Sequence, residues 1–189
     1  MVTKKDSIIK MKSSEMLYNF LENTNLHKKD FAQMIGVTLS YVYNLIDETI
    51  PFSTRSTTLE RIATVMDISP EEFVEYKIPQ DPILFDEGTE FIKEKQKEMK
   101  MSTVQFLKSF PRKQRLEIVD ILRGARPIPL DWEEVCIIAQ VLNISKEEMY
   151  NYWEARLKQV LQNAGFNFEN NSDLAKTMLN CCRDFVYKN

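Results

Sequence analysis

Apolar residues recur at helical spacing through most of the chain, and the most informative stretch is residues 28–46, KKDFAQMIGVTLSYVYNLI. Its first half has an apolar face formed by Phe31, Ala32 and Ile35. Its second half has one formed by Val42, Leu45 and Ile46. Because residues three and four apart share a helix face, the pattern predicts two short helices joined by a tight turn.

Gly36 and Thr38 define this turn. Glycine takes the left-handed conformation that ends a helix at little steric cost. Thr38 is a good N-cap, because its hydroxyl can accept a hydrogen bond from a backbone N–H of the next helix. The second helix should then turn one set of side chains outward: Leu39, Ser40, Tyr41, Tyr43 and Asn44.

Similar patterns predict helices on both sides. Residues 14–23 should form a helix capped by Ser13 or Ser14, and Thr57 or Thr58 should cap one that runs to Met66. Residues 69–72, SPEE, are typical of a helix start, with an N-cap, an early proline and acids that suit the helix dipole. The loop at residues 47–57 contains Pro51 and Arg55 and should be irregular. Together these segments predict a five-helix domain at residues 14–77.

This ordered set resembles the helix-turn-helix domain of the lambda-repressor-like (Cro/XRE-type) family. The matching residues are Phe31-Ala32, Ile35-Gly36-Val37-Thr38, Ser40, Val42, Leu45, Pro51, Leu59, Ile62-Ala63, Met66, Ile68-Ser69 and Phe73. Two departures are Ile46, where the family often has Glu, and the lack of a glycine after the second helix of the motif. Both concern the shape of the following loop.

The resemblance implies DNA contacts, because in this family the third helix lies in the major groove. Ser40 and Asn44 would reach bases, and Asn44 can pair with adenine through two hydrogen bonds. Thr38 or Leu39 would meet a thymine methyl group. The remaining implied contacts are to sugar or phosphate, with basic residues at the start of the second helix favoured by its N–H groups: Tyr41, Tyr43, Lys28, Lys29 and Arg55.

A repeat at an offset of 76 residues predicts a second copy. Residues 68–76 match residues 144–152, and Ile62-Ala63 matches Ile138-Ala139. We expect residues 86–153 to form a second, divergent domain of the same fold. Its turn, residues 109–112, has no glycine and a shift of one residue, and Pro111 suits the first turn of its third helix.

The second copy carries the most basic local cluster of the chain: Lys108, Arg112, Lys113, Gln114 and Arg115. Three interpretations remain open for this cluster. It could be a second DNA reader, a phosphate clamp without base specificity, or part of a degenerate copy kept for protein contacts. DNA contact is slightly favoured.

Three further segments complete the predicted organisation. Residues 1–13 form a basic arm, which is either a solvated tail or a DNA-contacting arm. Residues 78–85, with two prolines, form a linker. Residues 154–189 extend the preceding helix and add a last amphipathic helix begun by Ser172. These helices either pack on the second domain or form a dimer interface.

Composition excludes several classes of function. The net charge of −3 does not indicate a nucleic-acid binder, but an acidic domain still binds DNA where its contacting face is locally basic. Three cysteines make a poor disulfide framework and favour the cytoplasm. No membrane-length apolar run, phosphate-binding loop or zinc spacing occurs, and His27 is the single histidine. We therefore expect no enzyme, cofactor or membrane span.

Two hypotheses follow from the sequence. In the first, the chain is an all-α, cytoplasmic transcriptional regulator that binds double-stranded DNA as a homodimer through one or both tandem domains. In the second, it is a protein-interaction module, such as an antirepressor or a regulator's partner, built on the same fold.

Overall fold

The structure is a computed structural model that describes residues 12–77 and 86–188, with only the backbone described for residues 185–188. Every regular element in these ranges is a helix, as predicted. The predicted linker and nearly all of the predicted N-terminal arm lie outside the described residues. Within the described part, no helix is both long and apolar enough to cross a membrane.

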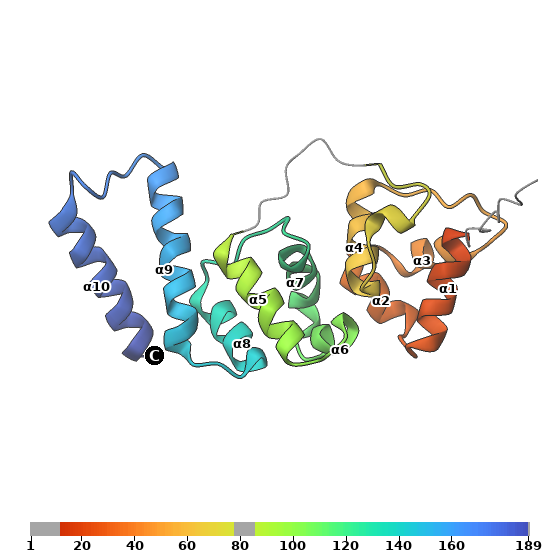
Figure 1. The fold of residues 1–189 in the computed structure, drawn as a ribbon, viewed down its shortest axis with the longest axis horizontal. Coiled ribbons are helices and arrows are strands. Elements are labelled where there is room, and N and C mark those ends of the chain that lie inside the picture. The colour runs from red at the N-terminus through yellow and green to blue at the C-terminus, as the bar shows by residue number, and fades with distance from the viewer. Residues whose placement is uncertain (1–11, 78–85, 189) are drawn as a thin grey trace, which may run out of the picture.

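The first helical group occupies one end of the molecule (Figure 1). It consists of α1 (Ser13–Asn23), α2 (Lys28–Ile35), α3 (Leu39–Ile46), α4 (Ser56–Met66) and the 3-10 turn η1 (Pro70–Glu72). The predicted inward residues meet in its core, where Leu17, Phe31, Ile35, Val42, Leu59 and Ile62 are all fully buried. Two short helices therefore span residues 28–46, as the apolar pattern predicted.

Tertiary contacts change the ends of several predicted helices. The α1 helix begins at Ser13, whose buried hydroxyl donates to Glu75 Oε2 at 2.5 Å rather than capping the helix. The α4 helix begins at Ser56 with Arg55 at the N-cap, so neither Thr57 nor Thr58 caps it.

The predicted fifth helix of the first group is only the short turn η1. The backbone becomes extended at Phe73, which places the phenyl ring in the core. There it stacks on Phe52 with ring centroids 6.0 Å apart. Burying this large apolar ring stabilises the fold by about 2 kcal/mol or more, which outweighs the stabilisation that a longer helix would give.

The second helical group lies beside the first and leads to the C-terminal helices (Figure 1). It consists of α5 (Glu87–Glu98), α6 (Thr103–Lys108), the 3-10 turn η2 (Arg112–Gln114), α7 (Arg115–Leu122), α8 (Trp132–Leu142) and α9 (Lys146–Asn163). The α9 helix is continuous through residue 153, so the predicted boundary between residues 153 and 154 falls inside it. The last helix, α10 (Ser172–Lys188), starts at Ser172.

The two groups have matching helix bounds. The α7 and α8 helices begin and end 76 residues after α3 and α4, while α6 begins 75 residues after α2. Asp67 and Asn143, also 76 residues apart, end α4 and α8 in the left-handed conformation. The offset changes from 75 to 76 residues in the turn between α6 and α7. That turn contains η2, so Pro111 precedes a 3-10 turn and does not lie in the first turn of the third helix as predicted.

The two groups share one continuous core, because α7 packs against both α2 and α4. Leu116 of α7 lies over the turn after α2, where a Cβ built on Gly36 would stand 2.9 Å from Leu116 Cδ2. Arg61 of α4 binds Asp120 of α7 through two hydrogen bonds of 2.8 and 2.9 Å. Thr103 N, at the start of α6, donates to Asp67 Oδ2 at 2.9 Å.

Asp120 belongs to a network of partly buried charges. Arg123, which follows α7, donates from Nε to Asp120 Oδ1 at 2.8 Å and also pairs with Glu60 of α4. Glu60 is 5% exposed, and its carboxylate accepts a second hydrogen bond from the Tyr76 hydroxyl at 3.1 Å. Burial, followed by this hydrogen bond, raises the pKa of Tyr76 to about 12. The tyrosine therefore remains a neutral donor.

Asp120 also links the stability of this contact to pH. Burial alone would raise the pKa of Asp120, but hydrogen bonds from Arg61 and Arg123 outweigh burial and hold this pKa below its ordinary value of 3.8. A group whose pKa is lower in the folded state stabilises the fold above its unfolded pKa. The contribution of Asp120 is therefore complete at neutral pH and is lost as the pH falls below about 4.

Asp120→Asn removes this charge with little change of shape. We expect its unfolding free energy at pH 7, measured by urea denaturation, to fall by about 2 kcal/mol, because charged hydrogen bonds are lost between partly buried groups. The difference from the parent should shrink below pH 4. Glu94→Gln, on an exposed position of α5, is the matched control. Equal urea midpoints for the two variants would contradict the role given to Asp120.

Candidate nucleic-acid interface

The turn between α2 and α3 fixes the angle of α3. Gly36 has φ of 72°, in the left-handed region, and Val37 N donates to Ala32 O at 2.9 Å. Thr38 is the N-cap of α3, and its Oγ1 accepts a hydrogen bond from Tyr41 N at 3.2 Å. Both predictions for this turn are confirmed. Because Val42 and Leu45 are buried against the core, α3 has one orientation and one outward face.

The outward face of α3 is open to solvent. Ser40 and Asn44 are exposed, Leu39 is 39% exposed and Tyr43 is 53% exposed. These four residues are called the reading face below. Tyr41 is different, because it is half-buried and its hydroxyl donates to Ser53 O at 3.1 Å. Its only hydroxyl proton therefore holds the loop after α3 and is not available to a phosphate.

The loop after α3 is closed by a side chain instead of the glycine that the family pattern would place there. Asp47 Oδ1 accepts hydrogen bonds from Thr49 Oγ1 at 2.6 Å and from Thr49 N at 2.9 Å, which together lower the pKa of Asp47. Ile46 is half-buried against the core. Arg55 is exposed at the start of α4.

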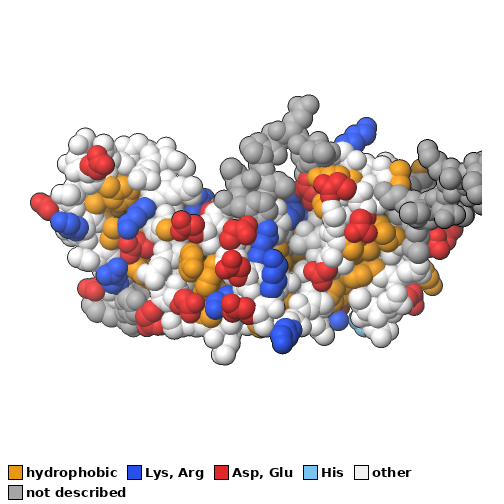
Figure 2. All heavy atoms as spheres, viewed as in Figure 1, with side chains coloured by type: hydrophobic (Ala, Val, Ile, Leu, Met, Phe, Trp, Pro, Cys, Tyr) orange, Lys and Arg blue, Asp and Glu red, His pale blue; other side chains and the backbone are white. Residues whose placement is uncertain are grey.

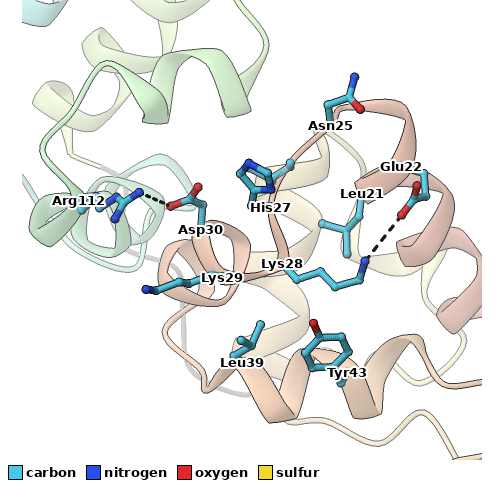
Figure 3. Close-up of a pocket in the computed structure, with 11 residues that line it drawn as sticks. Leu21, Glu22, Asn25, His27, Lys28, Lys29, Asp30, Leu39, Tyr43 and Arg112 are labelled. Atoms are coloured by element: carbon cyan, nitrogen blue, oxygen red, sulfur yellow. Dashed lines mark ion pairs between the residues drawn. The ribbon is translucent and has the colours of Figure 1, made fainter.

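A cleft of about 580 Å³ adjoins the reading face (Figure 3). Leu39 and Tyr43 line one side of it, and the start of α2 lines another. His27, at the N-cap of α2, makes no capping hydrogen bond with its side chain. Of the two predicted phosphate contacts there, Lys29 is exposed, whereas Lys28 Nζ lies 3.7 Å from Glu22.

The second group contributes one residue to this cleft. Arg112 of η2 reaches it, with Nη2 3.3 Å from Asp30 Oδ1 in the first turn of α2. Figure 3 shows Arg112 approaching Asp30 from a neighbouring chain segment, while Lys29 extends from the preceding position of α2. The structure thus brings together basic residues that the sequence analysis assigned to two separate DNA-binding surfaces.

Two predicted contact residues of the second group are buried. Gln114 is 6% exposed and Arg115 is 9% exposed. Arg115 donates from Nε to Phe110 O at 3.2 Å and from Nη2 to Lys108 O at 3.4 Å, and its Nη1 lies 3.9 Å from Asp30. The Arg115 guanidinium is thus engaged within the chain, and the Gln114 side chain is buried. The predicted direct role in DNA contact is therefore corrected for them, whereas Lys108, Arg112 and Lys113 are exposed.

The face of α7 that corresponds to the reading face is occupied by protein. At the offset of 76 residues, Ser40, Tyr43 and Asn44 correspond to Leu116, Val119 and Asp120. Leu116 packs over the turn after α2, Val119 is fully buried and Asp120 binds Arg61. In this arrangement, a DNA groove has no access to that face.

Sequence reasoning missed the acids that organise this region. The sequence analysis singled out neither Asp30 nor Asp120. Their partners Arg112 and Arg61 are distant in the chain and meet them only after the two groups dock. No local pattern carries that information.

No group of three or more His, Cys, Asp or Glu side chains in residues 12–77 and 86–184 is placed to hold a metal ion. His27 is exposed at the rim of the cleft. On the face seen in Figure 2, acidic and basic side chains are interspersed over the second group. For contact with DNA, local excesses of positive charge matter more than the net charge of −3.

Comparison with known proteins agrees with this geometry for the first group. A search of curated proteins and a search of solved structures found no match to the chain. Residues 16–79, about a third of the chain, match the model of the Cro/C1-type HTH DNA-binding domain. The match spans nearly all of α1, all of α2, α3 and α4, and η1, and so includes the reading face. It supports the assignment of this segment to the helix-turn-helix family and, in general terms, of the chain to the DNA-binding regulators.

Proposed function

We propose that this chain is a sequence-specific regulator of transcription that occupies a double-stranded DNA operator through α3. The observation that carries the proposal is the reading face, an open helix surface held rigidly by the Gly36–Thr38 turn. Ser40 and Asn44 supply hydrogen-bonding groups for base edges in a major groove. Leu39 offers an apolar contact to a thymine methyl group, and Tyr43 a contact to sugar or phosphate.

The second group is, in this proposal, a divergent copy of the first domain that no longer reads bases. Matching helix bounds support common descent. Leu116 and Val119 at reading positions support the loss of readout, because apolar side chains there serve the contact with α2 and α4. Of the three interpretations left open by the sequence, a second reader of bases now has the least support. Each chain then carries one reading helix.

One reading helix per chain makes a homodimer the natural binding unit. Two-fold related helices reach two half-sites about one helical turn apart, and their affinities combine. The α10 helix offers a surface for this purpose. It packs on α9 through Tyr150, whose hydroxyl lies 3.4 Å from Leu179 O. Leu174 remains 54% exposed and Met178 36% exposed, and Figure 2 shows apolar side chains at the surface of this end of the molecule.

The rival function is a protein-interaction module. It is favoured by the second group, in which the face equivalent to the reading face already binds protein within the chain. The exposed Leu39 and Tyr43 could serve a partner in the same way. The two functions differ in the role of Asn44, which matters for base readout and has no special value in an apolar contact.

Asn44→Ala tests base readout. We expect the variant to lose about 1–3 kcal/mol of binding free energy at the selected DNA site and to tolerate other bases at one position, because a bidentate contact is removed. Competition binding with single-base variants of the site measures both effects. Asn151→Ala, on an exposed position of α9, is the matched control. If the Asn44 variant keeps the parent's base preference, α3 is not the reading helix.

Leu174→Glu tests the proposed dimer surface. Sedimentation of the parent should give twice the chain mass of 22.3 kDa. The dimer of the variant should dissociate at a concentration more than about tenfold higher than the parent dimer does, because a two-fold interface loses both copies of the buried leucine. Lys176→Glu, which also adds an acid to an exposed position of α10, controls for charge. A monomeric parent, or equal dissociation of the two variants, would contradict this surface.

A further inference from the structure

The basic residue contributed by the second group lies where the reading face ends. Arg112 lines the same cleft as Leu39 and Tyr43, two members of the reading face, although it follows them by about 70 residues in the chain. The cleft is therefore continuous with the surface that the proposed function assigns to a major groove. A duplex seated on α3 would carry one of its backbones past this cleft.

A buried residue holds Arg112 in this position. Arg115 binds the carbonyl groups of Lys108 and Phe110, on the N-terminal side of η2, and reaches Asp30 of α2. Asp30 lies in the first turn of α2, where the helix dipole favours a carboxylate. The turn carrying Arg112 is thus tied to the first group by Arg115 and Asp30. Arg115 is a positioning residue for Arg112.

In this arrangement, Arg112 can still bind a further group. Its side chain is 63% exposed, and a guanidinium has five N–H donors, of which the contact to Asp30 can occupy only a part. The cleft contains the cations Lys28, Lys29 and Arg112 and the anions Glu22 and Asp30. Its charged side chains therefore sum to one positive charge, in a chain whose net charge is −3.

We propose that Arg112 binds a backbone phosphate of the same duplex that α3 reads, so that the second copy completes the DNA surface of the first domain. This inference rests on the proposed function. Arginine suits the task, because its planar fork binds phosphate oxygens through two hydrogen bonds. Lys29 provides a neighbouring charge on the same side. A phosphate contact fixes the position of the protein on DNA and carries no base information.

Arg112→Gln, with Lys176→Gln as the control for loss of one exposed charge, tests the proposal. Binding of the full chain to its selected site should weaken about fivefold at 0.15 M salt, because each phosphate contact scales affinity with roughly the −0.9 power of salt concentration. The slope of log affinity against log salt should become shallower by about 0.9. Arg112→Lys should retain the charge and most of the slope.

Two further readouts separate a phosphate contact from an indirect effect. Phosphate ethylation of the parent's site should interfere with binding at one position per half-site that no longer matters for Arg112→Gln. The sequence motif selected by Arg112→Gln should equal that of the parent. A changed motif would mean that Arg112 reads a base, and the proposal of a phosphate contact would then be wrong.

The outcomes also distinguish a failure of this inference from a failure of the proposed function on which it rests. If the parent selects a motif, but Arg112→Gln has the affinity and salt slope of Lys176→Gln, the inference is wrong and the proposed function stands. If the parent selects no motif, the proposed function fails and the inference with it. Urea denaturation of Arg112→Gln should match the parent, since the side chain is exposed, so a loss of affinity is not a loss of fold.

Discussion

The docking of α7 against α2 and α4 is the contact on which the rest of the molecule depends. Asp120 is held by Arg61 and Arg123, and Arg123 in turn neutralises the buried carboxylate of Glu60. Charges removed from water are tolerated only when each has a partner, so this arrangement accepts one relative placement of the two groups and penalises others. Leu116 packs closely over Gly36, and this steric fit also restricts how the two groups can be placed.

Because of this contact, the corresponding faces of α3 and α7 differ in their exposure. The α3 face keeps polar residues at Ser40 and Asn44 and remains open, whereas α7 carries Leu116 and Val119 at the positions 76 residues after Ser40 and Tyr43 and is covered by protein. The contact that covers the α7 face thus leaves the α3 face open to solvent. It also brings η2 to the start of α2, where a basic turn adds charge to the open face.

Sequence patterns predicted the local features of the structure and missed the features that depend on docking of the two helical groups. Helical periodicity and the glycine at position 36 placed α2 and α3, because both signals act within a few residues. Helix ends were less predictable: Ser13 binds Glu75 instead of capping α1, and burial of Phe73 stops the fifth helix of the first group. The burial of Arg115 could not be predicted, since a basic cluster gives no sign of an acid contributed by a distant helix.

The most direct test of this account is selection of bound duplexes from a random DNA library with the purified chain, followed by sequencing. One reading helix per chain and a two-fold dimer predict a palindromic motif with half-sites about one helical turn apart. A longer, asymmetric motif bound by a single chain would mean that the second group reads bases despite its buried face. The absence of any enriched motif would contradict the central claim that α3 recognises DNA.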